Sequence, residues 1–540
     1  MREREIPDNI KLLDCTLRDG GYINDWKFGH ENIVNIFERL VAAGVDIIET
    51  GFIDERRPFD MDRSIVPDVH GMNRLLDGLD HGTSMVVGMI DYGTCGIDRI
   101  LPADESCLDG IRVIFKKHHM TDALSFCEKI KALGYAVFVQ AVSITSYNEE
   151  EYEQLLSEVN KIKPYAFSMV DTYGLLHKKQ LKFYFDRANE RLCPDICLGY
   201  HSHNNFQLAY ANCIELLEEQ INRTVVVDGT LYGMGKSAGN APIELLATYM
   251  NENCGKAYHR SQLLEAIDVT IMDIYRTSPW GYQFKFFLSA SNDCHPNYVS
   301  YLMDKKKLSV KSINEILESL EPDKKLLYDE AYIEKLYIDY QKNICDDTND
   351  IEGLKERFEG KEILLLAPGH SVYTEYNKVI EYIRNNKPIV ISMNFCPEGY
   401  PLDYIFMSNA KRYVRLSSVL ANLPSQIRTI ATSNVTRAKG QFDYILNYSA
   451  WLDEDALIVD NPMLMFMKVL KQIGVDKVTL AGFDGYTKSE TEDYVNPNMA
   501  YSFSKEKAME INEDVINGLK KLQWYDHFQF LTESLYERNN

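Results

Sequence analysis

Residues 197–205 read CLGYHSHNN, an apolar run typical of a β-strand that ends on two histidines. Side chains alternate between the faces of a β-strand, so His201 and His203 project from the same face. Two imidazoles placed side by side are half of a site for a first-row metal ion. The order of the strands determines which oxygen ligands can complete it.

Short apolar runs alternate with amphipathic stretches over the first 250 residues. Helical patterns such as ENIVNIFERLVAAG and TDALSFCEKIKALG separate the runs, and they carry the usual start and stop signals. This alternation predicts a (β/α)8 TIM barrel, with a doubly wound open sheet as the alternative. The predicted strands are residues 11–17, 46–52, 84–90, 111–115, 136–142, 166–172, 197–203 and 224–230.

A closed barrel would bring four polar side chains to one sector of its rim. Asp19 follows the first predicted strand, His201 and His203 end the seventh, and Asn240 follows the eighth, which neighbours the first. Two imidazoles, a carboxylate and an amide oxygen suit Mn²⁺ or Mg²⁺, with positions left for water or substrate. Zn²⁺ fits less well because no thiolate joins the set. The alternative is a pair of structural histidines.

Four separated segments carry a family resemblance. LLDCTLRDGG (12–21), DTYG (171–174), GYHSHNNFQLAYAN (199–212) and DGTLYGMGKSAGN (228–240) resemble the signature segments of a metal-dependent superfamily of TIM barrels. It comprises pyruvate aldolases, acyl-CoA lyases such as hydroxymethylglutaryl-CoA lyase, and acyl-CoA synthases. The similarity covers about residues 11–345 and is greatest to 4-hydroxy-2-oxovalerate aldolase, whose helical region after the barrel resembles residues 281–320.

The resemblance implies aldol cleavage or condensation of a 4-hydroxy-2-oxo acid through a pyruvate enolate, which a divalent cation stabilises as a Lewis acid. Arg18 would add a cation at the enolate oxygen, unless it forms only a salt bridge at the rim. Glu49 would orient Arg18 or a water. Asp171 and Thr172 would contact the substrate or support the ligands, unless they only form a strand-end turn. Lys116 would contact a substrate carboxylate, unless it is a solvated rim charge.

The general base departs from the family pattern. In the oxovalerate aldolases a histidine stands three residues after the ligand aspartate, whereas this chain has Tyr22 there. A tyrosine with a pKa of about 10 is a poor base at neutral pH. Two replacements are open: Tyr22 acting through a water, or His295 reaching over from the helical region. Tyr298 matches a tyrosine of the family's small domain. For His295 the alternative is no catalytic role.

The second half of the chain predicts further domains, because 540 residues exceed what one core usually organises. Residues 345–361, CDDTNDIEGLKERFEGK, read as a polar connector with a short helix. A new α/β pattern begins at EILLLAPGHS and predicts an open, mostly parallel Rossmann-like sheet. The predicted domains are the barrel (1–255), its helical extension (256–344), the connector (345–361) and the Rossmann-like domain (362–540).

The segments APGHS, SMNF, FMSN and LAGFDGY in this half resemble a bacterial sialyltransferase-like group associated with surface polysaccharides. The resemblance implies a weak site for a nucleotide or nucleotide-sugar at the ends of the strands, where such sheets bind ligands. The alternative is a set of turn-forming residues. The candidate residues are Gly369, His370, Ser371, Asn394, Asn409 and Asp484.

Composition excludes other classes of protein. A net charge of −22 and a pI near 5.1 argue against binding to nucleic acid or an anionic membrane. No apolar run approaches the roughly 18 residues of a membrane span, and MREREIPDN lacks the apolar core of a secretory signal. Eleven dispersed cysteines without a CxxC pair predict a cytoplasmic protein with reduced thiols.

Three functional alternatives stay open beside a metal-dependent carbon–carbon lyase. The first is an acyl-CoA condensing synthase with the same site. The second is a scaffold or nucleotide-binding protein whose barrel has lost catalysis. The third is a metal-free aldolase with a lysine Schiff base, for which the candidates are Lys116 and Lys117 at the end of the fourth predicted strand. A homo-oligomer is also left open.

Overall fold

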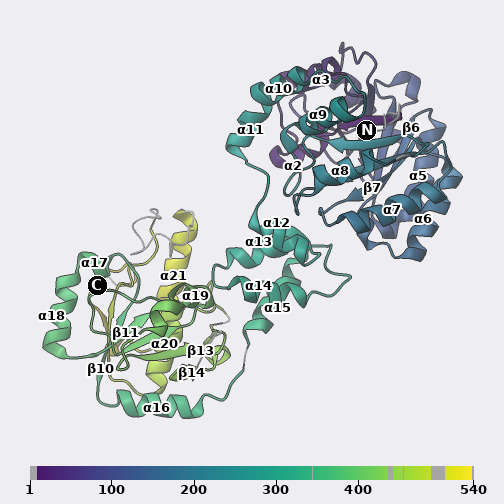
Figure 1. The fold of residues 1–540 in the computed structure, drawn as a ribbon. Helices are drawn as coiled ribbons and strands as arrows, with labels where there is room; N and C mark the ends of the chain where they lie inside the picture. Colours follow the sequence, from purple (N-terminus) through teal and green to yellow (C-terminus); the bar gives the residue numbers. More distant parts are fainter. Residues whose placement is uncertain are drawn as a thin grey trace. The chain divides into compact units, whose positions relative to one another are not determined.

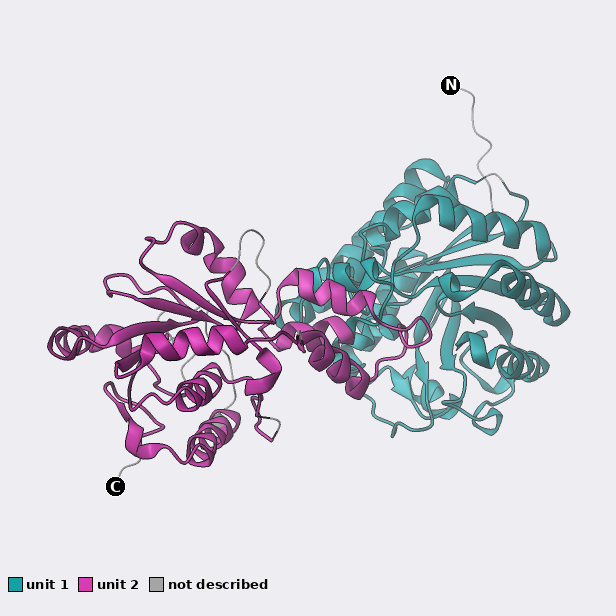
Figure 2. Cartoon of the chain, turned by 90° about the horizontal axis from the view of Figure 1, so that it is seen from below, with its two compact units in different colours: residues 1–296 teal, residues 297–540 magenta. Residues whose placement is uncertain are grey.

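The computed structural model describes residues 9–219, 221–342, 344–435, 442–453, 455–487 and 505–537. The chain forms two compact units, residues 1–296 and 297–540 (Figures 1 and 2). The domain boundaries at residues 255, 344 and 361 stay predictions.

The first unit contains a closed barrel of eight parallel strands. The strands follow each other around the barrel, and β1 pairs directly with β2 through Leu13–Ile47 and Asp14–Ile48. This closure confirms the predicted (β/α)8 barrel and excludes the open sheet. The strands are β1 (Ile10–Asp14), β2 (Ile47–Ile53), β4 (Met85–Asp91), β5 (Gly110–Phe115), β6 (Ala136–Ala141), β7 (Ala166–Asp171), β8 (Cys197–Ser202) and β9 (Val225–Gly229), with the short β3 (Ile65–Val66) attached to β2.

Helices follow seven of the eight barrel strands. After β4 the chain forms only two 3-10 turns, Ile97–Arg99 and Ala103–Glu105. Gly93, Gly96 and Pro102 break that stretch, since glycine and proline both disfavour a helix interior. The helices are α3 (His30–Ala43), α4 (Val69–Leu75), α5 (Met120–Ala132), α6 (Glu149–Ile162), α7 (Lys178–Arg191), α8 (Ala209–Leu217) and α9 (Ile243–Asn253), followed by α10 (Arg260–Ala266), α11 (Met272–Thr277) and α12 (Phe284–Ser291).

The second unit begins with helices and continues into a seven-stranded sheet. All pairings in this sheet are parallel, which confirms the predicted parallel sheet. Its relation to Rossmann-like folds stays a prediction. The strand order is β14 (Tyr444–Leu446), β13 (Arg428–Thr432), β12 (Tyr404–Met407), β11 (Ile389–Met393), β10 (Glu362–Leu366), β15 (Lys477–Ala481) and β16 (Phe528–Phe530).

The helices of this unit either precede the sheet or connect its strands (Figure 1). Among the described residues, no helix combines the length and the apolarity needed to cross a membrane. The helices are α13 (Pro296–Asp304), α14 (Val310–Glu318), α15 (Glu330–Gln341), α16 (Thr348–Phe358), α17 (Ser371–Thr374), α18 (Tyr376–Asn386), α19 (Ala410–Ala421), α20 (Pro462–Gln472) and α21 (Lys505–Lys521).

The segment predicted as a polar connector contains α16, and this helix packs on the sheet. Leu354 and Phe358 are fully buried in a core cluster of the second unit. Just before and within the helix, Asp347 accepts a hydrogen bond from the backbone N–H of Asn447, and Asp350 accepts one from Ile445. The helix is therefore an integral part of this unit.

Candidate metal centre and active site

Three predicted ligands lie together at the carboxyl-terminal rim of the barrel. Asp19 ends α1 (Thr16–Asp19), the helical turn after β1, while His201 lies on β8 and His203 immediately follows it. One potential ligand atom from each lies within 4.8 Å of the others. Asn240 forms a backbone bridge with His203, and its side-chain amide donates to Asp19 Oδ2 at 2.5 Å.

The charges of these groups suit a cation. Burial alone would raise the pKa of Asp19, but Arg18, His203, His201 and the Asn240 hydrogen bond outweigh it, so the pKa lies below its usual value. Burial lowers the pKa of His203 to about 3, so its imidazole is neutral at pH 7. The set therefore offers a carboxylate and a neutral imidazole, the forms in which these side chains bind metals.

Unsatisfied buried atoms in the same place support this fit. Among the described residues, Asn240 Oδ1 and His203 Nδ1 are buried without a hydrogen-bond partner. A buried polar atom needs a partner, which an ion, a ligand or a water can supply. The residues present thus fit a divalent cation held by Asp19, His201 and His203, with Asn240 beside it.

A second group of potential ligands shares His201. The side chains of Cys15, His201 and Asp228 also approach within 4.8 Å of one another. Burial raises the pKa of the Cys15 thiol well above its usual value, so the thiol stays protonated and binds metal poorly. Asp228 Oδ2 lies 3.1 Å from His201 Nδ1. This contact fixes the imidazole and leaves Nε2 for the centre formed with Asp19 and His203.

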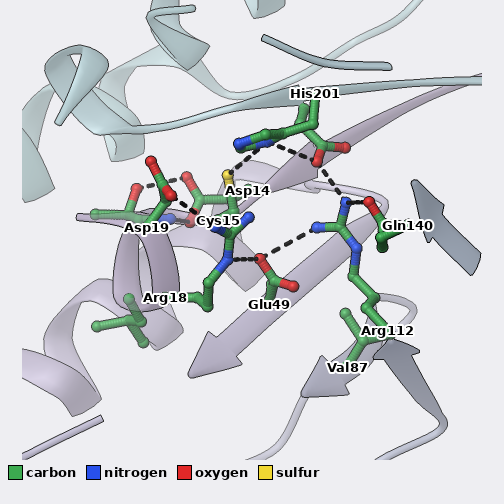
Figure 3. Close-up of polar contacts among 12 residues, drawn as sticks. Asp14, Cys15, Arg18, Asp19, Glu49, Val87, Arg112, Gln140 and His201 are labelled. Atoms are coloured by element: carbon green, nitrogen blue, oxygen red, sulfur yellow. Dashed lines mark hydrogen bonds and ion pairs between the residues drawn. The ribbon is translucent and has the colours of Figure 1, made fainter. Parts of the chain in front are cut away.

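Arg18 is buried beside the ligands and is held by two carboxylates (Figure 3). Its Nε donates to Glu49 Oε2 at 2.7 Å, and its Nη1 donates to Asp19 Oδ1 at 2.6 Å. Glu49 lies on β2 and accepts this hydrogen bond from Arg18; its predicted role stays a prediction. Among the described residues, no hydrogen bond engages Nη2 of Arg18, so this nitrogen is available to a substrate oxygen.

The two candidate bases differ in their surroundings. Tyr22 lies on α2 (Gly21–Asn24), and its ring packs edge-on against Trp26. Tyr22 is 41% exposed, but desolvation of its hydroxyl and the Asp19 carboxylate raise its pKa, so even less of it is phenolate, the form that could act as a base, at neutral pH. Burial, with help from Lys236 and Lys116, lowers the pKa of His295 to about 4. His295 is thus neutral at pH 7 and able to accept a proton.

Lys236 is a functional candidate that sequence reasoning missed. Its backbone N–H donates to Asp19 Oδ2 at 3.3 Å, and its ammonium lies 5.4 Å from the centre of the Tyr22 ring. Burial lowers the pKa of Lys236, whereas Lys116 is exposed at the end of β5. Lys117 binds Glu151 on the outside of the barrel. The lysine nearest to the metal ligands is therefore Lys236.

The side chains of Asp171 and Thr172, at the end of β7, accept hydrogen bonds from backbone N–H groups. The Asp171 carboxylate accepts hydrogen bonds from the N–H groups of Leu175 and Leu176, and burial raises its pKa to about 6. The Asp171 carbonyl oxygen accepts from the N–H of His203 at 3.2 Å. Thr172 Oγ1 accepts from the N–H of Ser143. Both residues thus shape the turns around the site, and Asp171 also positions a ligand.

Tyr298 belongs to the second unit and is fully buried there. Its hydroxyl oxygen lies 2.6 Å from the carbonyl oxygen of Leu327 and 3.0 Å from that of Lys324, which share its single proton, and it accepts from the N–H of Asp329. These bonds give it a structural role, and its catalytic role stays a prediction.

The predicted nucleotide-binding residues lie at the carboxyl ends of the strands of the second sheet. Ser371 donates its N–H and its hydroxyl to the Asp484 carboxylate, so this carboxylate occupies the turn after β10. Asn394 accepts from the N–H groups of Ser408 and Asn409, and Asn409 caps α19. A cavity of about 300 Å³ is lined by four of the six predicted residues, Gly369, Asn394, Asn409 and Asp484, whereas His370 and Ser371 are not part of its lining.

A glycine is required at position 235, where the loop after β9 passes close to the side chains of Asn240 and Asp19. A Cβ atom on this residue would lie 2.1 Å from Asn240 Nδ2 and 2.5 Å from Asp19 Oδ2. Sequence reasoning missed this glycine, and it also missed Arg112 and Asp228 in the barrel interior. Their signal was present, because a charged residue within an apolar strand such as IRVIF or TVVVDGT must find a buried partner.

Comparison with known proteins shows what the barrel is similar to. Residues 109–271, in the first unit, match the HMGL-like family model. The barrel of the first unit is therefore similar to HMGL-like proteins.

Curated proteins similar to this chain include several aldolases and a decarboxylase. The 4-hydroxy-2-oxovalerate aldolase 6 of Rhodococcus jostii (strain RHA1) is 28% identical over 255 residues, 46% of this chain and 69% of that protein. The oxaloacetate decarboxylase of Mycobacterium tuberculosis (strain ATCC 25618 / H37Rv) is 26% identical over 286 residues, 50% of this chain and 76% of that protein. The crystal structure of hydroxymethylglutaryl-CoA lyase from Pseudomonas aeruginosa is 18% identical, with a TM-score of 0.42, and covers 51% of this chain and 96% of that one.

Proposed function

We propose that the barrel is a divalent-metal-dependent aldolase that cleaves or forms a carbon–carbon bond with pyruvate as one of its partners. The proposed substrate class is a 4-hydroxy-2-oxo acid, and the proposed metal is Mn²⁺ or Mg²⁺. The observation that carries the proposal is the convergence of Asp19, His201 and His203 within 4.8 Å, with Arg18 bound to Asp19. The aldolase names of several relatives support it.

The donor set indicates the kind of metal. The carboxylate and amide oxygens favour Mn²⁺ or Mg²⁺, whereas the two imidazoles by themselves would also suit Zn²⁺. When bound, such a cation acts as a Lewis acid on the keto oxygen of a 2-oxo acid. Asp19, His201 and His203 would hold it, and Asn240 Oδ1 is placed to reach it or a water beside it.

Arg18 and a base would perform the remaining steps. Negative charge develops on the C2 oxygen when the bond between C3 and C4 breaks, and Arg18 Nη2 would donate a hydrogen bond to that oxygen. The C4 hydroxyl must lose its proton as the aldehyde forms; neutral His295 would accept this proton and then return it to C3, which converts the enolate into pyruvate. Lys236 or Lys116 would pair with the substrate carboxylate.

A pyruvate-release screen tests this function. Purified protein with Mn²⁺ would be given 4-hydroxy-2-oxo acids of increasing chain length, and oxaloacetate, with pyruvate detected by its reduction to lactate. We expect turnover of one or more 4-hydroxy-2-oxo acids. Turnover of oxaloacetate alone would indicate a decarboxylase, and release of free coenzyme A from acetyl-CoA with a 2-oxo acid would indicate a condensing synthase. No turnover by metal-loaded protein would favour the non-catalytic scaffold.

For the second unit we propose binding of a nucleotide or nucleotide-sugar. The supporting observation is the cavity of about 300 Å³ at the carboxyl ends of β10, β11, β12 and β15. The strand order reverses between β10 and β15, and open parallel sheets bind ligands at such a switch point. Its lining combines Lys305, Lys307 and Arg412 with four acidic residues and with apolar and aromatic side chains, and the two lysines pair with Glu334 and Asp460. A role in surface-polysaccharide metabolism stays a prediction.

Calorimetric titration of the full chain tests this site. The probes are CMP, UMP, AMP and inorganic phosphate. We expect a nucleotide to bind, and Arg412→Ala to weaken that binding. Arg415→Ala is the matched control, because it lies on the same helix outside the cavity lining. An absence of heat with every nucleotide would refute the proposal, and binding unchanged by Arg412→Ala would place the ligand elsewhere.

We propose a reducing, cytoplasmic environment for the chain, because its eleven cysteines are dispersed without a CxxC pair.

A further inference from the structure

Arg112 is a buried cation in the barrel interior that the proposed chemistry does not use. It lies on β5 and has no exposed surface. Its guanidinium lies between two carboxylates from other strands, Glu49 on β2 and Asp228 on β9. Arg112 Nη1 lies 3.1 Å from Glu49 Oε2, and Nη2 donates to Asp228 Oδ2 at 2.5 Å.

The same two carboxylate oxygens also bind residues of the metal centre. Glu49 Oε2 accepts from Arg18 Nε at 2.7 Å, and Asp228 Oδ2 lies 3.1 Å from His201 Nδ1. Among the described residues, the other oxygens, Glu49 Oε1 and Asp228 Oδ1, have no hydrogen-bond partner. Each carboxylate is therefore held through one oxygen, with Arg112 on one side and a site residue on the other.

These contacts form a continuous chain from Arg18 through Glu49, Arg112 and Asp228 to His201. Figure 3 shows its first part, from Arg18 through Glu49 to Arg112. Gln140 on β6 fixes the guanidinium in place. It accepts from Arg112 Nη2 at 3.2 Å and donates to Ser168 Oγ at 2.9 Å. The orientation of Arg112 is thus set by partners on several strands of the barrel.

We propose that Arg112 is a positioning residue that holds Arg18 and His201 in the positions that the metal centre requires. It holds the Glu49 carboxylate in position to bind Arg18 and the Asp228 carboxylate in position to bind His201. The inference rests on the proposed metal-dependent function. A guanidinium suits this task, because its rigid fork can serve two carboxylates at once, whereas an ammonium is a point donor. Without Arg112, two buried carboxylates lose their shared cation and must rearrange or recruit water.

Direct measurement of Mn²⁺ affinity tests the proposal without relying on catalysis. Free Mn²⁺ would be titrated by electron paramagnetic resonance against the wild type, Arg112→Met and Arg112→Lys. We expect Arg112→Met to weaken Mn²⁺ binding by about 10–100-fold, the usual effect of losing a partner that supports a metal ligand. Arg112→Lys should recover part of this loss, since it keeps the charge but not the fork.

Arg223→Met is the matched control. Arg223 is also a buried arginine, but it precedes β9 and donates to the carbonyl oxygens of Leu192, Cys193 and Ile196. Its removal should lower the melting temperature and leave Mn²⁺ affinity unchanged. If Arg112→Met does not fold, the affinity of Arg112→Lys decides the question.

The outcomes separate the two proposals. A folded Arg112→Met or Arg112→Lys that binds Mn²⁺ as tightly as the wild type would overturn the role of Arg112. A wild type that binds Mn²⁺ but releases no pyruvate would refute the proposed aldolase activity, and the affinities would still decide the role of Arg112. A wild type that binds no Mn²⁺ would refute the metal centre and both proposals with it.

Discussion

Asn240 donates a hydrogen bond to Asp19 at 2.5 Å, although 221 positions separate the two residues in the chain. The contact crosses the seam between β1 and β9, which pair along five residues from Ile10–Val225 to Asp14–Gly229. The candidate metal centre therefore spans the first and last strands of the barrel. Its geometry depends on barrel closure, and ligands contributed by either strand alone would not form it.

Arg18 and Asp19 are neighbours whose replacement should have different effects. We expect Asp19→Ala to abolish both Mn²⁺ binding and turnover, because Asp19 is the only carboxylate in the proposed ligand set. Arg18→Ala should keep Mn²⁺ bound and lower kcat by about 10²–10³, the usual effect of losing one donor to developing charge. Mn²⁺ titration and steady-state kinetics measure both effects. Unchanged turnover in Arg18→Ala would remove this residue from the mechanism.

The pH dependence of kcat/KM distinguishes His295 from Tyr22 as the base. Burial lowers the pKa of His295 to about 4, so its basic form is present above that pH and is lost only as the pH falls through it. We therefore expect kcat/KM to stay flat between about pH 7 and 9. His295→Gln should lower it, and Tyr22→Phe should not. A rate that climbs about tenfold per pH unit over this range would instead identify Tyr22, whose pKa is raised.

Gly235→Ala should damage the metal centre through packing alone. The added Cβ would overlap Asn240 Nδ2 and Asp19 Oδ2, so one of these side chains must move. We expect Mn²⁺ binding to weaken about 10–100-fold, as for other losses of support around a metal ligand. Gly44→Ala is the control, since its Cβ would meet nothing within 4 Å and its φ of 77° costs about 1 kcal/mol of stability. Equal Mn²⁺ affinity in both variants would contradict the crowding argument.

Phe358→Ala tests whether α16 is part of the second unit. In the fragment of residues 297–540, burial of Phe358 predicts a loss of about 3–5 kcal/mol in the free energy of unfolding, measured with urea. Glu352→Ala, an exposed position on the same helix, should change it by less than about 0.5 kcal/mol. Equal, small effects of the two substitutions would show that α16 is a loosely attached connector.

The sequence was sufficient for the barrel and for the placement of the ligands, since both follow from simple geometry. The period-two pattern identifies the strands, and barrel closure places the last strand, β9, beside the first, β1. Asp19, His203 and Asn240 are therefore expected to lie close together. The absence of a helix after β4 could also have been predicted, because Gly93, Gly96 and Pro102 interrupt that stretch.

Contacts that depend on side-chain direction were not predictable. Arg112 and Asp228 interact across the lumen, and only the register of the strands shows that they meet. The sequence of the turn after β10, APGHS, resembles a ligand-binding loop, yet its Ser371 N–H donates to the Asp484 carboxylate at 2.8 Å. Tyr298 matched a family tyrosine in sequence, but its hydroxyl is bound by backbone groups of the second unit.

The most direct test of the metal-dependent aldolase is pyruvate release by metal-free protein as Mn²⁺ is restored. Protein stripped with EDTA and dialysed should release no pyruvate from a 4-hydroxy-2-oxo acid. Adding Mn²⁺ should restore a saturable rate in the wild type and none in Asp19→Ala. Release that persists in EDTA, with borohydride trapping the substrate on Lys236 or Lys116, would contradict the metal centre and establish a Schiff-base aldolase instead.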